Sequence, residues 1–204
     1  MICGLLGQKL GHSYSPQIHR KLSDYSYLLF EKEPNEIENF LKTADFQGLN
    51  VTIPYKKSVI PYCDHLSDQA QKIGAVNTIV KRSDGTLIGH NTDYYGFRSM
   101  AERSGIDFTG KKVLVLGSGG ASNTVCCVMK ELSANAIVIS RTGENNYQNL
   151  NLHKDCAAII NTTPIGMYPQ TGASPLDISV FPKLDVSVPH ICQTPQRTME
   201  GLKC

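Results

Sequence analysis

In the first part of the chain, short apolar runs alternate with stretches whose apolar residues recur at helical spacing. In Pro34–Ala44, Ile37, Phe40 and Leu41 fall on one face and proline occupies the first turn, which predicts a helix. Further helices are predicted from Ser15 and over Asp68–Ile73. The predicted strands are Ile2–Gly7, Tyr25–Phe30, Gly48–Ile53, Ala75–Val80 and Leu87–Gly89. This alternation predicts an α/β layer.

A second alternation follows Tyr94–Ser104, which is predicted as a connecting helix. Lys111–Leu116 has the apolar character of a buried strand, and Gly119–Leu132 has the pattern of a helix. Further strands are predicted at Asn135–Ser140 and Cys156–Asn161. Strand–helix units with short turns favour parallel pairing. The predicted fold class is therefore α/β, with an N-terminal α/β substrate domain over residues 1–102 and a Rossmann-like, doubly wound dinucleotide-binding domain over residues 103–204.

Composition and charge narrow the range of partners. The chain has 204 residues, of which 41% are hydrophobic and 19% charged, and a formal net charge of +2. It has no basic stripe of the kind that binds nucleic acid. No apolar run approaches the ~20 residues that span a bilayer. Met1–Gly7 lacks the basic leader of a signal peptide. We therefore expect a cytoplasmic protein that binds small molecules and neither nucleic acid nor membranes.

The seven cysteines and six histidines lack the spacing of a disulfide framework or a metal site. No CxxC occurs, and Cys126 and Cys127 are adjacent on a predicted helix. Without a secretory leader, we expect reduced thiols that mostly contribute to packing. No HExxH or other paired-ligand spacing is present, so no metal site is expected.

A glycine-rich turn follows the apolar strand Val113–Leu116 directly. In such a turn the first glycine makes the tight bend, the second lets a pyrophosphate approach the backbone, and the helix N-terminus faces the anion. A glycine-rich turn without a ligand is the alternative. The residues expected to contact a dinucleotide here are Gly117, Ser118, Gly119, Gly120, Ala121 and Ser122, the last filling the third small position.

The next predicted strand ends in Ser140-Arg141-Thr142, where an NAD-binding protein usually carries an acidic residue about 20 residues past the glycines. The fixed charge and planar fork of Arg141 suit a ribose 2′-phosphate, and the two hydroxyls can also donate. This favours NADP over NAD. A solvated surface arginine is the alternative, and the nearby Glu144 keeps NAD open.

The last predicted strand of this half runs into Asn161–Met167. Ligands bind outside the carboxyl ends of such strands, so Thr162 and Met167 in this loop are candidate nicotinamide contacts. An Asx or proline turn without a ligand role accounts for the local chemistry equally well.

Polar segments of the first half suggest a substrate site. Ser13 and Ser15 precede a predicted helix in which Ser15 is the N-cap and Pro16 the first residue, and their hydroxyls could hold a small carboxylate. Simple capping is the alternative. It explains Ser15 but not Ser13.

Lys56 and Asp93 are the candidate catalytic pair. Pro54 stiffens the loop that carries Lys56, and Asp93 follows a short polar segment. A surface lysine and a helix-capping aspartate are the alternatives. Together at one carbonyl, the two groups would supply a proton donor and a partner that orients it and keeps it charged. The side chains expected to bind ring hydroxyls are Asn50, Thr52, Asn77 and Asn91.

From about Gly4 to Met167 the chain resembles the shikimate dehydrogenase family. The matching segments are Gly11–Pro16 with His12, Asn50–Lys56, Gly74–Thr78, Gly89–Asp93, Gly117–Ser122 and Asn161–Met167. The resemblance implies NADPH-dependent reduction of 3-dehydroshikimate to shikimate, in aromatic amino-acid biosynthesis. It also implies that Ser13 and Ser15 bind the substrate carboxylate, that Thr52, Asn77 and Asp93 hold ring oxygens, and that Lys56 is the catalytic lysine. Arg141 would read the 2′-phosphate.

The chain departs from the family after Leu184-Asp185, where the family continues with a Tyr-Asn-Pro loop, further strands and helices that carry a substrate-binding glutamine. This chain reads Val186-Ser187-Val188-Pro189 and ends at Cys204. We therefore hypothesise a truncated or frameshifted C-terminus that leaves an apolar sheet edge exposed. Two other functions stay open, a quinate/shikimate dehydrogenase that uses NAD and a non-catalytic binding remnant. The expected assembly is a monomer or homodimer.

Overall fold

The computed structural model describes residues 1–11, 13–22, 24–167 and 172–188. Its contacts divide the chain into two compact units, Met1–Thr92 and Asp93–Cys204. The predicted connecting helix, observed as α4 (Asp93–Arg103), belongs to the second unit. The functional boundary expected between residues 102 and 103 stays a prediction, because a compact unit is defined by contacts and not by the ligand it binds.

The first unit is built on a six-stranded sheet in the order β2-β1-β3-β5-β6-β4. The strands β1, β2 and β3 are parallel, β5 runs antiparallel to β3 and β6, and β4 is parallel to β6. The strands are β1 (Ile2–Gly7), β2 (Ser26–Glu31), β3 (Gly48–Val51), β4 (His65–Leu66), β5 (Thr78–Lys81) and β6 (Leu87–His90). The helices are α1 (Ser15–Leu22), α2 (Ile37–Thr43) and α3 (Asp68–Ile73), with 3₁₀ turns at Pro34–Glu36 and Ile60–Tyr62.

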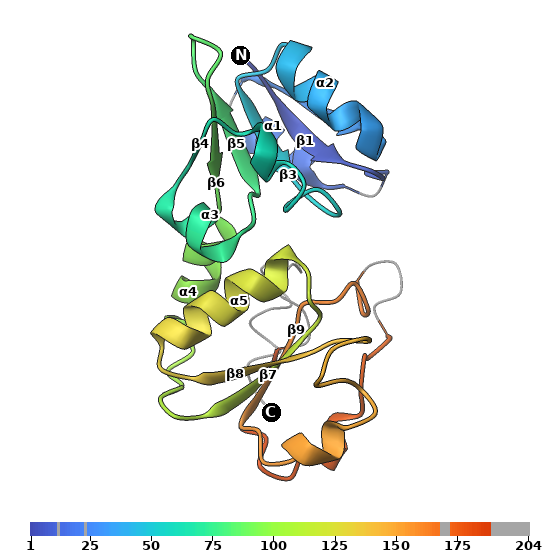
Figure 1. Cartoon of the computed structure of the whole chain (residues 1–204), viewed down its shortest axis with the longest axis vertical. Helices are drawn as coiled ribbons and strands as arrows, with labels where there is room; N and C mark the ends of the chain where they lie inside the picture. The colour runs from blue at the N-terminus through green and yellow to red at the C-terminus, as the bar shows by residue number, and fades with distance from the viewer. Residues whose placement is uncertain (12, 23, 168–171, 189–204) are drawn as a thin grey trace. The chain divides into compact units, whose positions relative to one another are not determined.

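The apolar face predicted for Pro34–Ala44 packs into the core of this unit. Ile37, Phe40 and Leu41 are buried on α2, in one cluster with Leu6 of β1 and Leu49 of β3. A 3₁₀ turn that begins with the proline precedes the helix. Burial of this face fixes α2 beside β1, as Figure 1 shows.

Four predicted strands of the first unit have different bounds in the structure, and for two of them one end differs by more than one residue. The chain leaves β3 after Val51, and the Tyr55 N–H donates to the Thr52 carbonyl in a turn (2.9 Å). Pro54 lies within that turn, after a cis peptide bond, and has no N–H to extend a ladder. Strand β5 begins at Thr78, because Gly74 ends α3 in the left-handed region (φ 67°) and the chain reaches the sheet only afterwards.

The second unit has a four-stranded parallel sheet in the order β10-β9-β7-β8. Figure 1 shows α5 lying across the sheet beside β7 and β8. Phe181 closes a buried cluster that includes Leu114, Ile139 and Ile159. The elements are α4, β7 (Lys112–Leu116), α5 (Gly120–Glu131), β8 (Asn135–Ile139), β9 (Ala158–Asn161) and β10 (Val186–Val188).

In the described residues, the structure adds three elements to those predicted for this unit: a 3₁₀ helix between β8 and β9, the 3₁₀ helix η4 (Ile178–Val180) and strand β10. The connection from β8 to β9 contains a 3₁₀ helix, η3 (Leu150–His153), where a complete strand–helix unit would have an α-helix. Strand β10 pairs in parallel with β9 and is itself the edge of this sheet, so the exposed apolar edge expected where the chain departs from the family stays a prediction. Alternating β-branched residues in Val186-Ser187-Val188 suit a short strand. Residues 189–204 lie outside the described residues.

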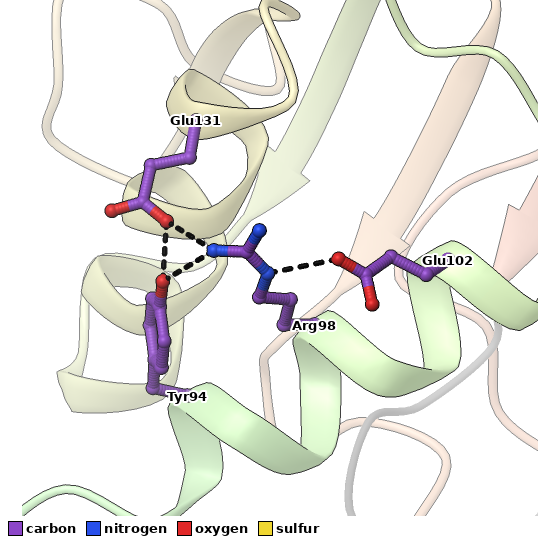
Figure 2. A network of polar contacts seen from close by, with 4 residues as sticks. All are labelled: Tyr94, Arg98, Glu102 and Glu131. Carbon is purple, nitrogen blue, oxygen red and sulfur yellow. Dashed lines mark hydrogen bonds and ion pairs between the residues drawn. The ribbon is translucent and has the colours of Figure 1, made fainter.

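Helices α4 and α5 are joined by the polar network in Figure 2. The Tyr94 hydroxyl donates to Glu131 Oε2, and Arg98 Nη1 donates to the Tyr94 hydroxyl (2.9 Å) and to Glu131 Oε2 (3.0 Å). Arg98 Nε donates to Glu102 one turn further along α4 (2.9 Å). Tyr94 is buried, so its hydroxyl needs a partner, and the network ties the first turn of α4 to the last turn of α5.

Candidate functional site

A polar network surrounds Asn77 at one edge of the first sheet. The parallel strands β1 and β3 end at this edge, β5 begins there and β6 also ends there, with Thr78 paired to both Asn50 and His90. Asn77 is only 7% exposed, and its Oδ1 accepts from the Thr92 N–H (2.8 Å) and from the hydroxyls of Thr92 and Thr78 (3.2 Å each). Its side chain is therefore held in one orientation at the edge.

Asn50 extends this network toward α1. Its Oδ1 accepts from the Tyr27 hydroxyl (2.7 Å), and its amide lies 3.5 Å from Thr78 Oγ1. The imidazole of His19 stacks on the Tyr27 ring with centroids 3.7 Å apart. Burial raises the pKa of Tyr27 to about 12, so this phenol stays a neutral donor.

The two serines at the start of α1 have different partners. Ser13 Oγ accepts from the Ser15 N–H (3.3 Å), so the capping oxygen at this end comes from Ser13, whereas the sequence pattern assigned it to Ser15. The Ser15 side chain lies near the Tyr27 hydroxyl and partly offsets the rise in the pKa of Tyr27 that burial causes. The helix itself begins at Ser15, one residue earlier than predicted. Both hydroxyls are half-buried. His12, from the same predicted motif, lies outside the described residues.

The expected substrate threonine and catalytic lysine follow β3. The Thr52 N–H donates to Leu6 of β1 (2.9 Å), which places Thr52 at the same edge as Asn50. Lys56 is half-buried, and its carbonyl accepts from the Val76 N–H (2.7 Å), next to Asn77 in the chain. Backbone hydrogen bonds thus hold the Lys56 loop against the segment that leads into the network.

Asp93 directly follows Thr92 and is the first residue of α4. Thr92 belongs to the first compact unit and Asp93 to the second, so the convergence expected for Lys56 and Asp93 stays a prediction. Asn91, also expected in the site, is only 1% exposed and donates from Nδ2 to the Ala75 carbonyl (3.0 Å). That contact braces the segment before Asn77.

The sequence pattern did not single out Thr92, Tyr27 or His19 as site residues. Thr92 is exposed and bonds Asn77 across 15 positions, and Tyr27 bonds Asn50 across 23. Tyr27 lies close to Ser15 and His19 only because α1 packs on β2. A signal for Thr92 was present, since it lies between Asn91 and Asp93 in one of the matched segments.

The glycine-rich turn in the second unit has the predicted strand–turn–helix form. Gly117 has a φ of 107°, and a Cβ there would lie 2.8 Å from Thr162 Oγ1. Gly119 is the N-cap of α5 and has no side chain to accept from the first N–H groups of the helix, and a Cβ on it would meet nothing within 4 Å. Ser122 is buried (1% exposed), as a small residue packed under the helix should be. These residues fit a bound pyrophosphate.

The loop after β9 also reaches this turn. Thr162 donates from its hydroxyl to the Leu116 carbonyl (2.6 Å), directly before Gly117. Asn161 Oδ1 accepts from the Thr163 N–H (2.9 Å), so the predicted Asx turn is present. Met167 closes the loop by donating its N–H to the Pro164 carbonyl (3.1 Å).

The segment expected to read the 2′-phosphate follows β8. Arg141 and Thr142 are exposed, whereas Ser140 is half-buried and donates its N–H to the Asn145 carbonyl (3.1 Å). Burial raises the pKa of the Tyr147 phenol, and the positive charge of Arg141 partly offsets this rise. Arg141 therefore lies close enough to Tyr147 to act on it electrostatically.

A cavity of about 360 Å³ lies elsewhere in the second unit, where α4 and α5 end. Its lining includes Glu102, Phe108 and Ser133 and none of the predicted site residues. In the described part of the chain, no cluster of three or more His, Cys, Asp or Glu side chains could hold a metal ion. Within that same part, no helix has the length and apolar content to cross a membrane.

The chain is similar to known proteins in both sequence and fold. Residues 5–79 match the family model described as the shikimate dehydrogenase substrate binding domain. A shikimate dehydrogenase (NADP(+)) from Clostridium perfringens strain SM101 is 40% identical over 208 residues, covering 91% of this chain and 76% of the relative.

Two crystal structures have the same fold. Shikimate dehydrogenase 1 from Peptoclostridium difficile is 34% identical, with a TM-score of 0.84 over 96% of this chain and 78% of that one. Shikimate 5-dehydrogenase from Thermus thermophilus, in complex with NADP(H) and shikimate, is 29% identical, with a TM-score of 0.75 over 92% of this chain and 77% of that one. From its sequence and its fold, this chain belongs to the shikimate dehydrogenase family.

Proposed function

We propose that this chain catalyses the NADPH-dependent reduction of 3-dehydroshikimate to shikimate. The observation that carries the proposal is the organised polar edge around Asn77 in the first unit, within the segment that matches the substrate binding domain. The strand–glycine turn–helix of the second unit would supply the complementary nucleotide site. The relatives are named for this enzyme and for NADP(+), and the Thermus thermophilus structure contains both NADP(H) and shikimate.

The substrate would bind at the polar edge through hydroxyl and amide groups. Ser13 and Ser15 would hold the carboxylate, since both hydroxyls lie at the start of α1. Asn50, Thr52 and Asn77 would hold ring oxygens. Because Asn50 and Asn77 are already fixed by Tyr27, Thr78 and Thr92, little side-chain entropy is lost on binding.

Lys56 and Asp93 would complete the chemistry at the substrate carbonyl. NADPH, when bound, supplies the hydride that converts this carbonyl to an alcohol. The Lys56 ammonium would donate the proton to the developing alkoxide, and the Asp93 carboxylate would orient the ammonium and keep it protonated.

The second unit would hold the cofactor at three places. Gly119 and the start of α5 would face the pyrophosphate, with the turn residues Gly117, Ser118, Gly120, Ala121 and Ser122 around it. Ser140, Arg141 and Thr142 would bind the 2′-phosphate. Thr162 and Met167 would border the nicotinamide. We further propose a cytoplasmic enzyme that is a monomer or homodimer, which cell fractionation and sedimentation equilibrium would test.

An absorbance assay of NADPH oxidation with 3-dehydroshikimate tests the reaction. We expect turnover in the unaltered chain and a loss of about 10²–10⁴-fold in kcat for Lys56→Ala. Lys57→Ala is the matched control, because the adjacent lysine is exposed and should leave kcat within about twofold. If the unaltered chain binds shikimate tightly but shows no turnover, it is a binding protein and the proposal is wrong.

Cofactor choice separates the shikimate enzyme from one that uses NAD with quinate. Arg141→Ala should raise the KM for NADPH by about 10-fold or more, with little change for NADH or for the acid, because a charge-assisted contact to phosphate is lost. Lys154→Ala removes another exposed cation of the second unit and is the control. Equal KM changes for both cofactors would contradict the role of Arg141, and faster quinate oxidation with NAD would favour the alternative enzyme.

A further inference from the structure

The loop that carries Arg141 has its shape set by amide side chains. Asn146 donates from Nδ2 to the Gly143 carbonyl (3.1 Å), and Asn149 donates from Nδ2 to the Glu144 carbonyl (2.9 Å). Asn149 Oδ1 also accepts from the Asn146 N–H (2.8 Å). Amides bonded to nearby backbone groups replace the ladder that this irregular segment lacks.

One further contact ties the loop to the body of the second unit. His153, at the end of η3, has its Nε2 3.0 Å from Asn145 Oδ1. The Asn145 carbonyl in turn accepts from the Ser140 N–H (3.1 Å), which is the backbone next to Arg141. His153 is therefore linked through one residue to the start of the segment expected to read the 2′-phosphate.

The environment of His153 fixes how this contact is made. The side chain is only 8% exposed, and its Nδ1 is buried with no hydrogen-bond partner. A buried N–H without an acceptor costs more than a buried lone pair beside apolar atoms, so the proton belongs on Nε2. Nε2–H then donates to Asn145 Oδ1. This contact is the hydrogen bond that the buried ring makes to the loop.

A fixed loop matters because Arg141 is exposed and its side chain is long. Ordering such a side chain on a ligand costs conformational entropy, and an unfixed backbone would add to that cost. The 2′-phosphate alone distinguishes NADP from NAD, so a loop that holds Arg141 in place improves the binding of one cofactor and not of the other.

We propose that His153 is a positioning residue for cofactor choice, which holds the Arg141 loop through Asn145 and so strengthens binding of the ribose 2′-phosphate. The inference deepens the proposed function and rests on the role assigned there to Arg141. It assigns to His153 no contact with cofactor or substrate.

Calorimetric binding of adenosine 2′,5′-bisphosphate and of AMP to the full chain tests the inference without substrate. His153→Leu should lower the affinity for the bisphosphate by about five- to tenfold, which corresponds to one lost hydrogen bond. It should lower the affinity for AMP by less than about twofold. His153→Gln keeps an N–H donor and should recover most of the affinity. Leu152→Ala changes an exposed residue of the same 3₁₀ helix (64% exposed) and should change neither affinity.

A second variant keeps the test decisive if His153→Leu does not fold. Asn145→Ala removes the acceptor and should lower the affinity for the bisphosphate as much as His153→Leu does. The double variant should lose no more affinity than either single variant. Unchanged bisphosphate affinity in Asn145→Ala, or equal losses for both nucleotides, would overturn the inference.

The outcome for the unaltered chain separates this inference from the proposed function. If the unaltered chain prefers the bisphosphate but the variants keep that preference, the role of His153 is wrong and NADPH-dependent reduction stands. If the unaltered chain binds AMP equally well, the role of Arg141 fails, and the inference fails with it.

Discussion

The two units form their proposed ligand-binding edges in different ways. In the first unit the edge is made by side chains that bond one another, with Asn77 joined to Thr92 and Thr78. In the second unit the corresponding turn is made by backbone, with Gly117 in the left-handed region and Gly119 opening α5. A sugar-like acid presents hydroxyls that side chains can discriminate, whereas a pyrophosphate is bound best by N–H groups at close range.

This difference predicts opposite responses to mutation. Where side chains form the site, removing one side chain should lose contacts and leave the backbone in place. Where the backbone forms the site, adding a single Cβ should do the most damage. Substitutions in the two units can test that contrast, beginning with the largest expected effect.

Gly117→Ala should be the most damaging of these substitutions. A Cβ at this position would lie 2.8 Å from Thr162 Oγ1 and 3.2 Å from Thr163 Cγ2, and φ is 107°. We expect the free energy of unfolding to fall by about 3 kcal/mol, from backbone strain and the clash together, with weaker NADPH binding. Chemical denaturation and fluorescence titration of NADPH measure the two effects.

Gly119→Ala is the matched control, because a Cβ there meets nothing within 4 Å and its φ is −82°. It should change the free energy of unfolding by less than about 0.5 kcal/mol. It should still weaken the binding of NADPH, since the added methyl would crowd the pyrophosphate. If Gly119→Ala binds NADPH as the unaltered chain does, the pyrophosphate does not approach this glycine.

Asn77→Ala should have a smaller effect, confined to the first unit. It removes the acceptor for Thr92 and Thr78, but Thr92 is exposed and water can replace part of the loss. We expect about 1–2 kcal/mol less unfolding free energy and a higher KM for the substrate, with unchanged NADPH affinity. Asn39→Ala, on the exposed face of α2, is the control. A matching loss of NADPH affinity would contradict the separation of the two edges.

The contrast also explains which elements could be predicted. The bounds of Ile2–Gly7 and Asp68–Ile73 were predicted correctly, and α2 buries the face its spacing indicates. Strands β4 and β10 were missed, because edge strands of two or three residues carry too little periodicity to distinguish. The end of β3 depends on the turn at Pro54, where local chemistry overrides the apolar run.

For the site, residue types were informative but partners were not. Asn50 and Asn77 were expected in the site and both lie at the polar edge, yet Thr92 and Tyr27 become visible only when the strands pair. The glycine turn was predictable in full, because a strand, three glycines and a helix adjoin in sequence. The link from His153 to the Arg141 loop was not, since a single buried histidine in sequence indicates packing as readily as a specific contact.

The smallest predicted effect concerns the network between α4 and α5 (Figure 2). Tyr94→Phe removes the hydroxyl that joins Arg98 and Glu131, but the Arg98–Glu131 ion pair (3.0 Å) can persist. We expect a loss of about 1 kcal/mol in unfolding free energy, with unchanged NADPH affinity because the glycine turn lies at the other end of α5.

The hydrogen bond to Glu131 raises the pKa of Tyr94 above its ordinary value of about 10, so the hydroxyl contributes fully to stability at neutral pH. This stabilisation is lost only as the pH rises through that raised pKa. The difference in unfolding free energy between the unaltered chain and Tyr94→Phe should shrink there. Tyr95→Phe alters the exposed neighbour (57% exposed) and should stay within about 0.5 kcal/mol. An equal loss in both variants would mean that ring packing, and not the hydroxyl, holds α4 to α5.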